Sequence, residues 1–163
     1  RIRHHPAVPA AGIAALISAE LGVLREFVDV LRREQAALTD GSTDSLMGLA
    51  EEKVRHAEHI ASLHRNRDAL LHSVGLKGGR EGIQALGDAG SLPIGAQNEL
   101  VTLLELAKEA RSLNELNGKL VNDRLQHNQK ALNALTSAAQ QSTIYGPDGH
   151  TQIGAAGRTL GSA

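Results

Sequence analysis

The stretch that decides the fold runs from Leu21 to Leu38 and reads LGVLREFVDVLRREQAAL. Its apolar residues recur at alternating steps of three and four, which places them along one side of an α-helix as a heptad seam. The seam comprises Leu21, Leu24, Val28, Leu31, Gln35 and Leu38, and the opposite, charged face comprises Glu20, Arg25, Asp29, Arg32 and Arg33. The pattern predicts a helix from about Gly12 to Asp40, ended by Gly41 because glycine readily takes the left-handed conformation of a helix cap.

Two later segments repeat this spacing, which predicts an all-α protein whose long antiparallel helices form a helical bundle or coiled coil. The second seam runs through Leu46, Leu49, Lys53, His56, Ile60, Leu63, Arg67, Leu70 and Val74. We expect Ser42, Thr43 or Asp44 to cap this helix and Gly75 to end it. The third and longest helix is expected from about Ala96 to Ala139.

Polar residues interrupt the second and third seams. Two interpretations apply to Lys53, His56 and Arg67 in the second seam. Either their stems lie on apolar surface with the polar head in water, or these side chains fix the register of the helices. The third seam is apolar up to Leu113 and then becomes largely polar. Its later positions are Asn114, Asn117, Val121, Arg124, Asn128, Ala131 and Leu135. Buried amides and charges cost free energy unless they are paired, so this half is expected to pack less firmly.

Residues 75–97 and 140–163 break the helical pattern. The first segment is glycine-rich, and we expect a connecting loop with a short helix near residues 81–86. Its sequence Gly78-Gly79-Arg80-Glu81-Gly82 lacks the preceding strand of a phosphate loop and is interpreted as a flexible link. The second segment contains the turn signal Gly146-Pro147-Asp148-Gly149, which would close a small hairpin. The predicted organisation is a helical-bundle domain at 1–139 and a flexible C-terminal tail at 140–163.

The composition argues against several classes of function. The formal net charge is −1, whereas a nucleic-acid binder usually carries a basic excess. Cysteine is absent, the aromatic residues are Phe27 and Tyr145, and no stretch approaches the roughly 20 apolar residues of a membrane span. The histidines lack the Glu-x-x-His spacing of bundle metal sites, and no nucleophile or phosphate-binding motif is present. We therefore expect no enzyme activity, metal, cofactor, nucleic acid or stable membrane insertion.

The third helix has more apolar surface than the other two can cover. Two antiparallel helices bury each other's seams. Too little chain then remains to cover the apolar residues at the far end of the third helix. An exposed apolar strip of this kind usually marks a docking surface. The strip consists of Leu116, Leu120, Val121, Leu125, Leu132 and Leu135. Two alternatives stay open: an intramolecular bundle with no exposed groove, and a structural coiled-coil adaptor that oligomerises through the same seams.

The stretch NELNGKLV at Asn114–Val121 resembles the signature of the FlgN family of flagellar export chaperones. Further matching positions are Lys53, Asn128, Leu132, Leu135 and the element Tyr145-Gly146-x-x-Gly149. The order, the spacing and the chain length fit together, and the similarity extends from about residue 16 to residue 151. The glycine-rich residues 75–95 and the Gly/Ala tail depart from the family pattern.

The resemblance implies a cytoplasmic, non-enzymatic chaperone that binds the C-terminal helices of the hook–filament junction proteins FlgK and FlgL. Such a chaperone prevents premature assembly of its clients and delivers them to the type III export gate protein FlhA. By motif position, the implied client-binding residues are Asn114, Asn117, Leu120, Val121, Leu125, Asn128 and Leu132. The exposed strip adds Leu116 to this set, and Tyr145 is implied as a gate-docking residue. A homo-oligomer is considered for the client-free chain.

Overall fold

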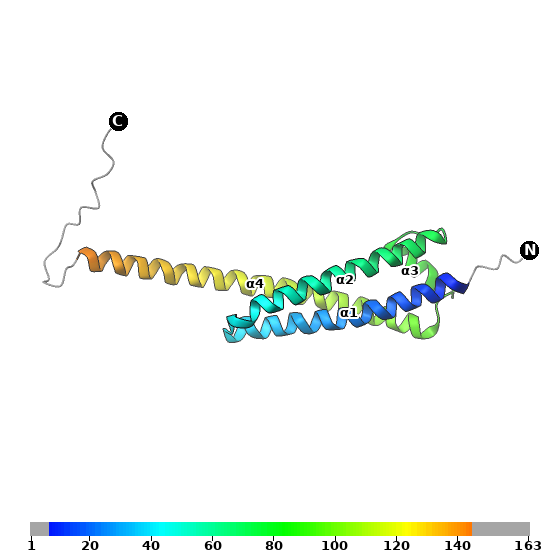
Figure 1. Ribbon diagram of the computed structural model, residues 1–163, viewed down its shortest axis with the longest axis horizontal. Coiled ribbons are helices and arrows are strands. Elements are labelled where there is room, and N and C mark those ends of the chain that lie inside the picture. Colours follow the sequence, from blue (N-terminus) through cyan, green and yellow to red (C-terminus); the bar gives the residue numbers. More distant parts are fainter. Residues whose placement is uncertain (1–6, 145–163) are drawn as a thin grey trace, which may run out of the picture. The chain divides into compact units, whose positions relative to one another are not determined.

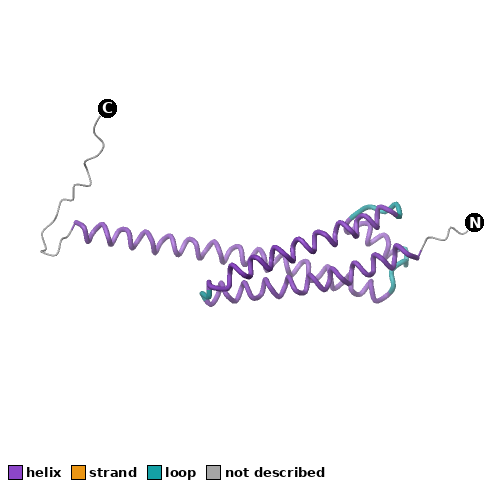
Figure 2. Tube along the Cα trace, viewed as in Figure 1, coloured by secondary structure: helices purple, strands orange, loops and turns teal. Residues whose placement is uncertain are grey.

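The computed structural model describes residues 7–144 of the chain. They form four α-helices and one short 3-10 helix (Figure 1 and Figure 2). The elements are α1 at Ala7–Asp40, η1 at Thr43–Ser45, α2 at Leu46–Ser73, α3 at Gly79–Asp88 and α4 at Ile94–Ile144. Within this range no residue belongs to a strand, and the all-α prediction is confirmed.

The chain divides into two compact units, one ending at Leu120 and the other beginning at Val121. The first unit contains α1, α2, α3 and the first half of α4. The second contains the remainder of α4. The helix itself is continuous through this point and extends past Ala139, so residues 140–144 of the predicted tail are helical. The predicted hairpin beyond Ile144 lies outside the described residues.

α1 and α2 run side by side and are joined by a tight turn at Gly41 (Figure 1). Gly41 has a φ of 78°, the left-handed conformation expected at the end of the first helix. The start of α2 differs from the prediction. Ser45 is its N-cap and forms no side-chain cap hydrogen bond, because the 3-10 turn at Thr43–Ser45 carries the chain into the helix instead.

The core of the first unit consists mainly of aliphatic side chains from all four α-helices. The predicted seam of α1 is buried at its leucines and at Val28, and Phe27 packs at the edge. The core residues are Ile13, Ile17, Leu21, Leu24, Val28, Leu31, Leu71, Ile83, Leu86, Leu92, Ala96, Leu103 and Ala110. α1 also buries Val23 and Val30, which lie off that seam, so its buried surface is wider than one heptad stripe.

The glycine-rich segment is not a flexible link, as the sequence had suggested; it builds the start of α3. The amide of Gly79 donates a hydrogen bond of 2.8 Å to Oδ1 of Asp68 on α2. At Gly82 a Cβ atom would lie 1.8 Å from the carbonyl oxygen of Lys77. The backbone at Gly82 therefore lies so close to the backbone at Lys77 that only glycine fits there. This close approach presents Ile83 and Leu86 to the core.

Candidate partner-binding surface

The second unit exposes an apolar stripe along α4. Val121 is 42% exposed, Leu125 62%, Leu132 57% and Leu135 69%. At about 100° of rotation per residue, these four and Asn128 fall within a sector of roughly 80° on one side of the helix. We call Val121, Leu125, Asn128, Leu132 and Leu135 the distal stripe. Every side chain from residue 125 to residue 141 is exposed.

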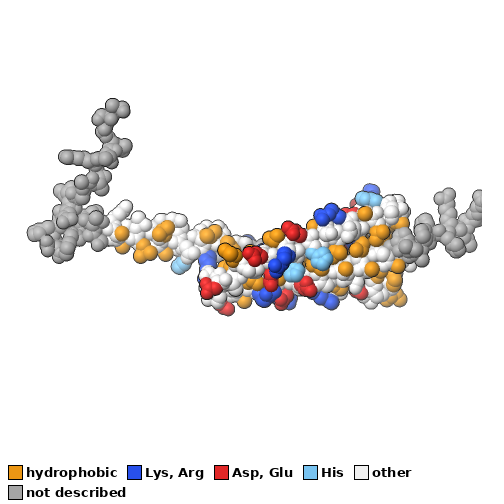
Figure 3. Space-filling model, in the orientation of Figure 1, with side chains coloured by type: hydrophobic (Ala, Val, Ile, Leu, Met, Phe, Trp, Pro, Cys, Tyr) orange, Lys and Arg blue, Asp and Glu red, His pale blue; other side chains and the backbone are white. Residues whose placement is uncertain are grey.

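The distal stripe lies in a stretch with few charges. Residues 131–144 contain no Asp, Glu, Lys or Arg, and Figure 3 shows hydrophobic side chains along this part of the helix. Polar character comes from Asn, Gln, Ser and Thr. Such a surface offers apolar contacts and hydrogen-bonding side chains with little electrostatic contribution.

The remaining predicted contact residues do not all share the face of the distal stripe. Leu116 is 42% exposed, but it lies five residues before Val121 and is therefore about 140° away around the helix. Leu120 is half-buried and Asn114 is exposed. Tyr145 lies outside the described residues. The structure therefore brings together Val121, Leu125, Asn128 and Leu132 on one face and separates Leu116 from them.

Asn117 is part of the core, which corrects the expectation that its side chain faces a client. Only 1% of the residue is exposed. Its Nδ2 donates hydrogen bonds of 2.9 Å to the carbonyl oxygen of Leu31 and to Oε1 of Glu34, both on α1. An amide at this seam position is stabilised because these acceptors are present. Asn117 thus holds the first half of α4 against α1.

The cations in the α2 seam are paired with carboxylates of α1. Arg67 and His64 both contact the buried carboxylate of Glu20, and Nζ of Lys53 lies 3.2 Å from Oε1 of Glu34. Glu20 is only 3% exposed, so its predicted place on the solvent face is wrong. These specific pairs favour the role of fixing helix register over that of stems lying on apolar surface.

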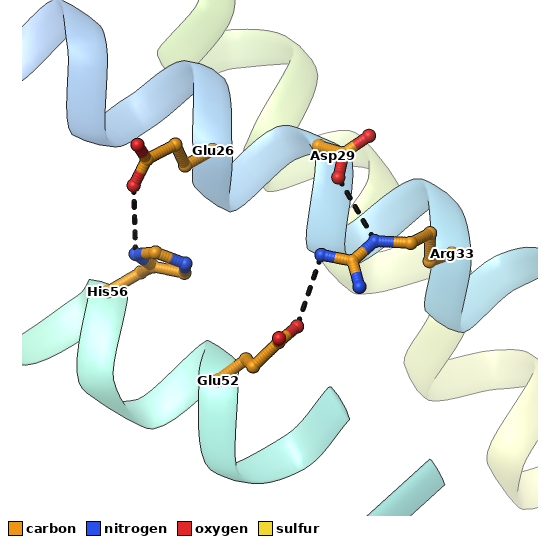
Figure 4. Close-up of polar contacts among 5 residues, drawn as sticks. All are labelled: Glu26, Asp29, Arg33, Glu52 and His56. Carbon is orange, nitrogen blue, oxygen red and sulfur yellow. Dashed lines mark hydrogen bonds and ion pairs between the residues drawn. The ribbon is translucent and has the colours of Figure 1, made fainter. Parts of the chain in front are cut away.

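A second line of polar contacts joins the more exposed edges of α1 and α2 (Figure 4). Nδ1 of His56 lies 3.6 Å from Oε2 of Glu26. Arg33 contacts Asp29 on its own helix at 3.0 Å and Glu52 on α2 at 3.1 Å. Exposed pairs of this kind each contribute about 0–1 kcal/mol, so they orient the two helices more than they stabilise them.

The first unit also contains a groove between α2 and α4, which the sequence interpretation missed. Two adjoining cavities form it, with volumes of about 410 Å³ and 390 Å³. Both are lined by Leu24, Ile60, His64 and Ala107. We call their combined lining the α2–α4 groove. The signal in the sequence was the pairing of Ala57 and Ala61 on α2 with Ala107 and Ala110 on α4, because small residues leave room between helices.

Across residues 7–144 no helix is both long enough and apolar enough to cross a bilayer. In the same part of the chain, no three His, Asp or Glu side chains converge as the ligands of a metal ion would.

The described residues thus define an all-helical protein that presents a stripe of leucines on a continuous long helix. The sequence profile described as FlgN protein matches residues 10–153. The chain is 29% identical over 135 residues to the flagella synthesis protein FlgN of Yersinia enterocolitica, covering 82% of this chain and 84% of that one. The counterpart from the O:8 serotype of the same species matches equally. No solved structure shows a significant match. The chain belongs to the FlgN family.

Proposed function

We propose that this protein is a flagellar export chaperone of the cytoplasm that binds the C-terminal helices of the hook–filament junction proteins FlgK and FlgL. It keeps these clients from assembling prematurely and delivers them to the export gate protein FlhA. Family membership and the name of the Yersinia relatives support a role in flagellar assembly. The exposed distal stripe is the single observation that carries the client-binding role.

The stripe suits an amphipathic client helix. Such a helix places apolar side chains at steps of three and four and lays them against a complementary surface. Full burial of a leucine side chain contributes about 1.5–3 kcal/mol, so Leu125, Leu132 and Leu135 are suited to act as anchors for a client helix. Asn128 lies among them and can fix the register of the client helix by hydrogen bonding. The few charges nearby permit release without breaking strong ion pairs.

Delivery requires a second contact, with the gate. We assign it to Tyr145, which follows directly after the last residue of α4 in the sequence. A tyrosine suits such a contact because it has a large apolar ring and a hydroxyl group that forms hydrogen bonds. A Tyr145→Ala variant should keep its client and export it poorly; normal export would remove Tyr145 from the proposal.

The client site is tested by Leu125→Glu combined with Leu132→Glu, with a FlgK C-terminal fragment as the titrant in calorimetry. We expect affinity to fall at least tenfold, because two charges are placed within the stripe. The matched control is Gln126→Glu with Asn133→Glu, which adds the same charge at the same separation about 100° further around the helix. Unchanged binding by the leucine variant, or equal loss in the control, would overturn the assignment.

Sedimentation separates this proposal from a coiled-coil adaptor. A chaperone forms a complex with the FlgK fragment, and its distal stripe is covered only in that complex. A stable homo-oligomer that buries Leu125 and Leu132, and that the fragment does not dissociate, would favour the adaptor instead.

A further inference from the structure

The α2–α4 groove has the length and shape needed to bind one more helix. Its α4 wall extends from Leu100 to Asn114, which is roughly 20 Å at 1.5 Å per residue. Its α2 wall runs from Ala57 to Arg67. The α2 positions are 57, 60, 61, 64 and 67, and the α4 positions include 100, 103, 104, 107, 110, 111 and 114. Both series follow helical periodicity, so each helix offers one continuous face to the groove.

The lining of the groove is apolar and open to solvent. Val101 is 58% exposed and Leu104 is 39% exposed, although both lie on the half of α4 that is otherwise packed in the first unit. In the half of the groove away from α3 the lining includes the small side chains Ala57, Ala61 and Ala107. Small side chains there allow a helix to approach closely, while the leucines and isoleucines at the end near α3 form a deeper recess.

The charges of the groove that have no ion-pair partner are of one sign. Arg80 lies at one end of the groove and Arg111 toward the other. Among the described side chains no carboxylate forms an ion pair with Arg80 or Arg111. The one acidic residue in the lining is Glu20, whose carboxylate is already paired with Arg67 and His64. A helix seated here therefore meets an apolar floor and basic ends.

We propose that the α2–α4 groove is a second client site, which takes an amphipathic helix with leucine-sized anchors and acidic residues at its flanks. This inference rests on the proposed chaperone function. The apolar face of the client helix covers Ile60, Leu100 and Leu104, and its carboxylates pair with Arg80 and Arg111. One segment of a client then lies on the distal stripe and another in the groove, so that the two contacts reinforce each other as linked binding sites do.

The apolar part of the proposal is tested by Val101→Glu with Leu104→Glu. The control is Met47→Glu with Val54→Glu, since these residues are 76% and 56% exposed and lie outside the groove lining. The titrant is a FlgK C-terminal fragment that contains the complete terminal helical region. We expect at least a tenfold loss of affinity for the groove variant and less than twofold for the control. Circular dichroism checks folding, and Val101→Glu alone replaces the double variant if it unfolds.

The charge part is tested by Arg80→Glu with Arg111→Glu. We expect weaker binding and a smaller dependence of affinity on salt, because the ion pairs with the client are lost. Arg55→Glu with Arg65→Glu is the control, since these two exposed arginines of α2 lie outside the lining. Unchanged affinity and salt dependence in the groove variant would show that the occupant is not acidic and would overturn the proposal.

A direct readout of location is available because the chain contains no cysteine. A fluorophore on Val101→Cys should report a change of environment when the fragment binds, whereas one on Val54→Cys should not. Fragment binding that leaves the groove label and the groove variants unaffected removes this inference and leaves the proposed function in place. Failure of the unaltered protein to bind the fragment removes both. If the groove variants lose self-association but still bind the fragment, the occupant is a second copy of the chain and the inference is overturned.

Discussion

Asn117 on α4 donates a hydrogen bond of 2.9 Å to Oε1 of Glu34 on α1. The same oxygen lies 3.2 Å from Nζ of Lys53 on α2. Glu34, a residue that is 8% exposed, thereby ties three helices together near the end of the first unit. Because Asn117 and Glu34 are both buried, each depends on the other for a hydrogen-bond partner.

Asn117→Ala should lower the free energy of unfolding by about 1–3 kcal/mol, the cost of leaving buried acceptors without their donor. Urea denaturation measures this change. Asn128→Ala is the control, because that side chain is exposed and should change stability by less than about 0.5 kcal/mol. Equal effects of the two substitutions would mean that the hydrogen bonds of Asn117 do not hold α4 to α1.

Arg67→Met should be destabilising by about 3 kcal/mol or more, because it leaves the buried carboxylate of Glu20 without its arginine. The measurement is thermal or urea unfolding of the free protein. The double variant Glu20→Leu with Arg67→Met should recover most of the loss, since it removes both charges and keeps the volume. A double variant no more stable than Arg67→Met would contradict the pairing argument.

Gly82→Ala and Gly87→Ala should act in opposite directions, although both lie in α3. At Gly82 a Cβ atom would overlap the carbonyl oxygen of Lys77, and the backbone must move, so we expect a loss of more than about 2 kcal/mol. At Gly87 nothing lies within 4 Å of the added atom, and alanine should stabilise the helix by up to about 1 kcal/mol. Urea titrations of the two variants measure these changes. A Gly82→Ala variant as stable as the unaltered protein would disprove the close approach of Gly82 to Lys77.

Hydrogen exchange should separate the two halves of α4 in the free protein. Amides before Asn117 should be protected by the core, whereas amides beyond Leu125 should exchange rapidly, because side chains 125–141 are exposed. Addition of the FlgK fragment should slow exchange along the distal stripe. Full protection through Leu135 without any fragment would contradict this expectation.

The sequence predicted the three long helices because each has a regular seam, although α4 continues past its predicted end at Ala139. The leucines of Leu21–Leu38 are buried as expected, and Gly41 ends α1 in the left-handed conformation. The prediction assumed, however, that α1 buries only one face. α1 packs against more than one helix, so Glu20 and Glu34, which lie beside the seam, are buried as well. A single period along one helix does not reveal how many neighbours that helix will have.

The candidate site was predictable only in part. Exposure of Leu125 and Leu132 followed from counting the helices available to cover them, and their exposure is what the structure shows. The buried place of Asn117 did not follow, since a seam amide is compatible with either a core hydrogen bond or a partner contact. The groove depends on the distance between α2 and α4, which are far apart in the sequence, and no local pattern encodes that distance.

The continuity of α4 has a consequence for how its last turns form. Starting a helix is the costly step, whereas adding a residue to an existing end is not. The turns anchored by Leu103, Ala110 and Asn117 act as a nucleus, so the turns beyond Val121 need only propagate from it. A client therefore meets a surface whose helical form is continuous with turns that are already packed in the core. The ordering entropy lost on capture is smaller than for a disordered segment.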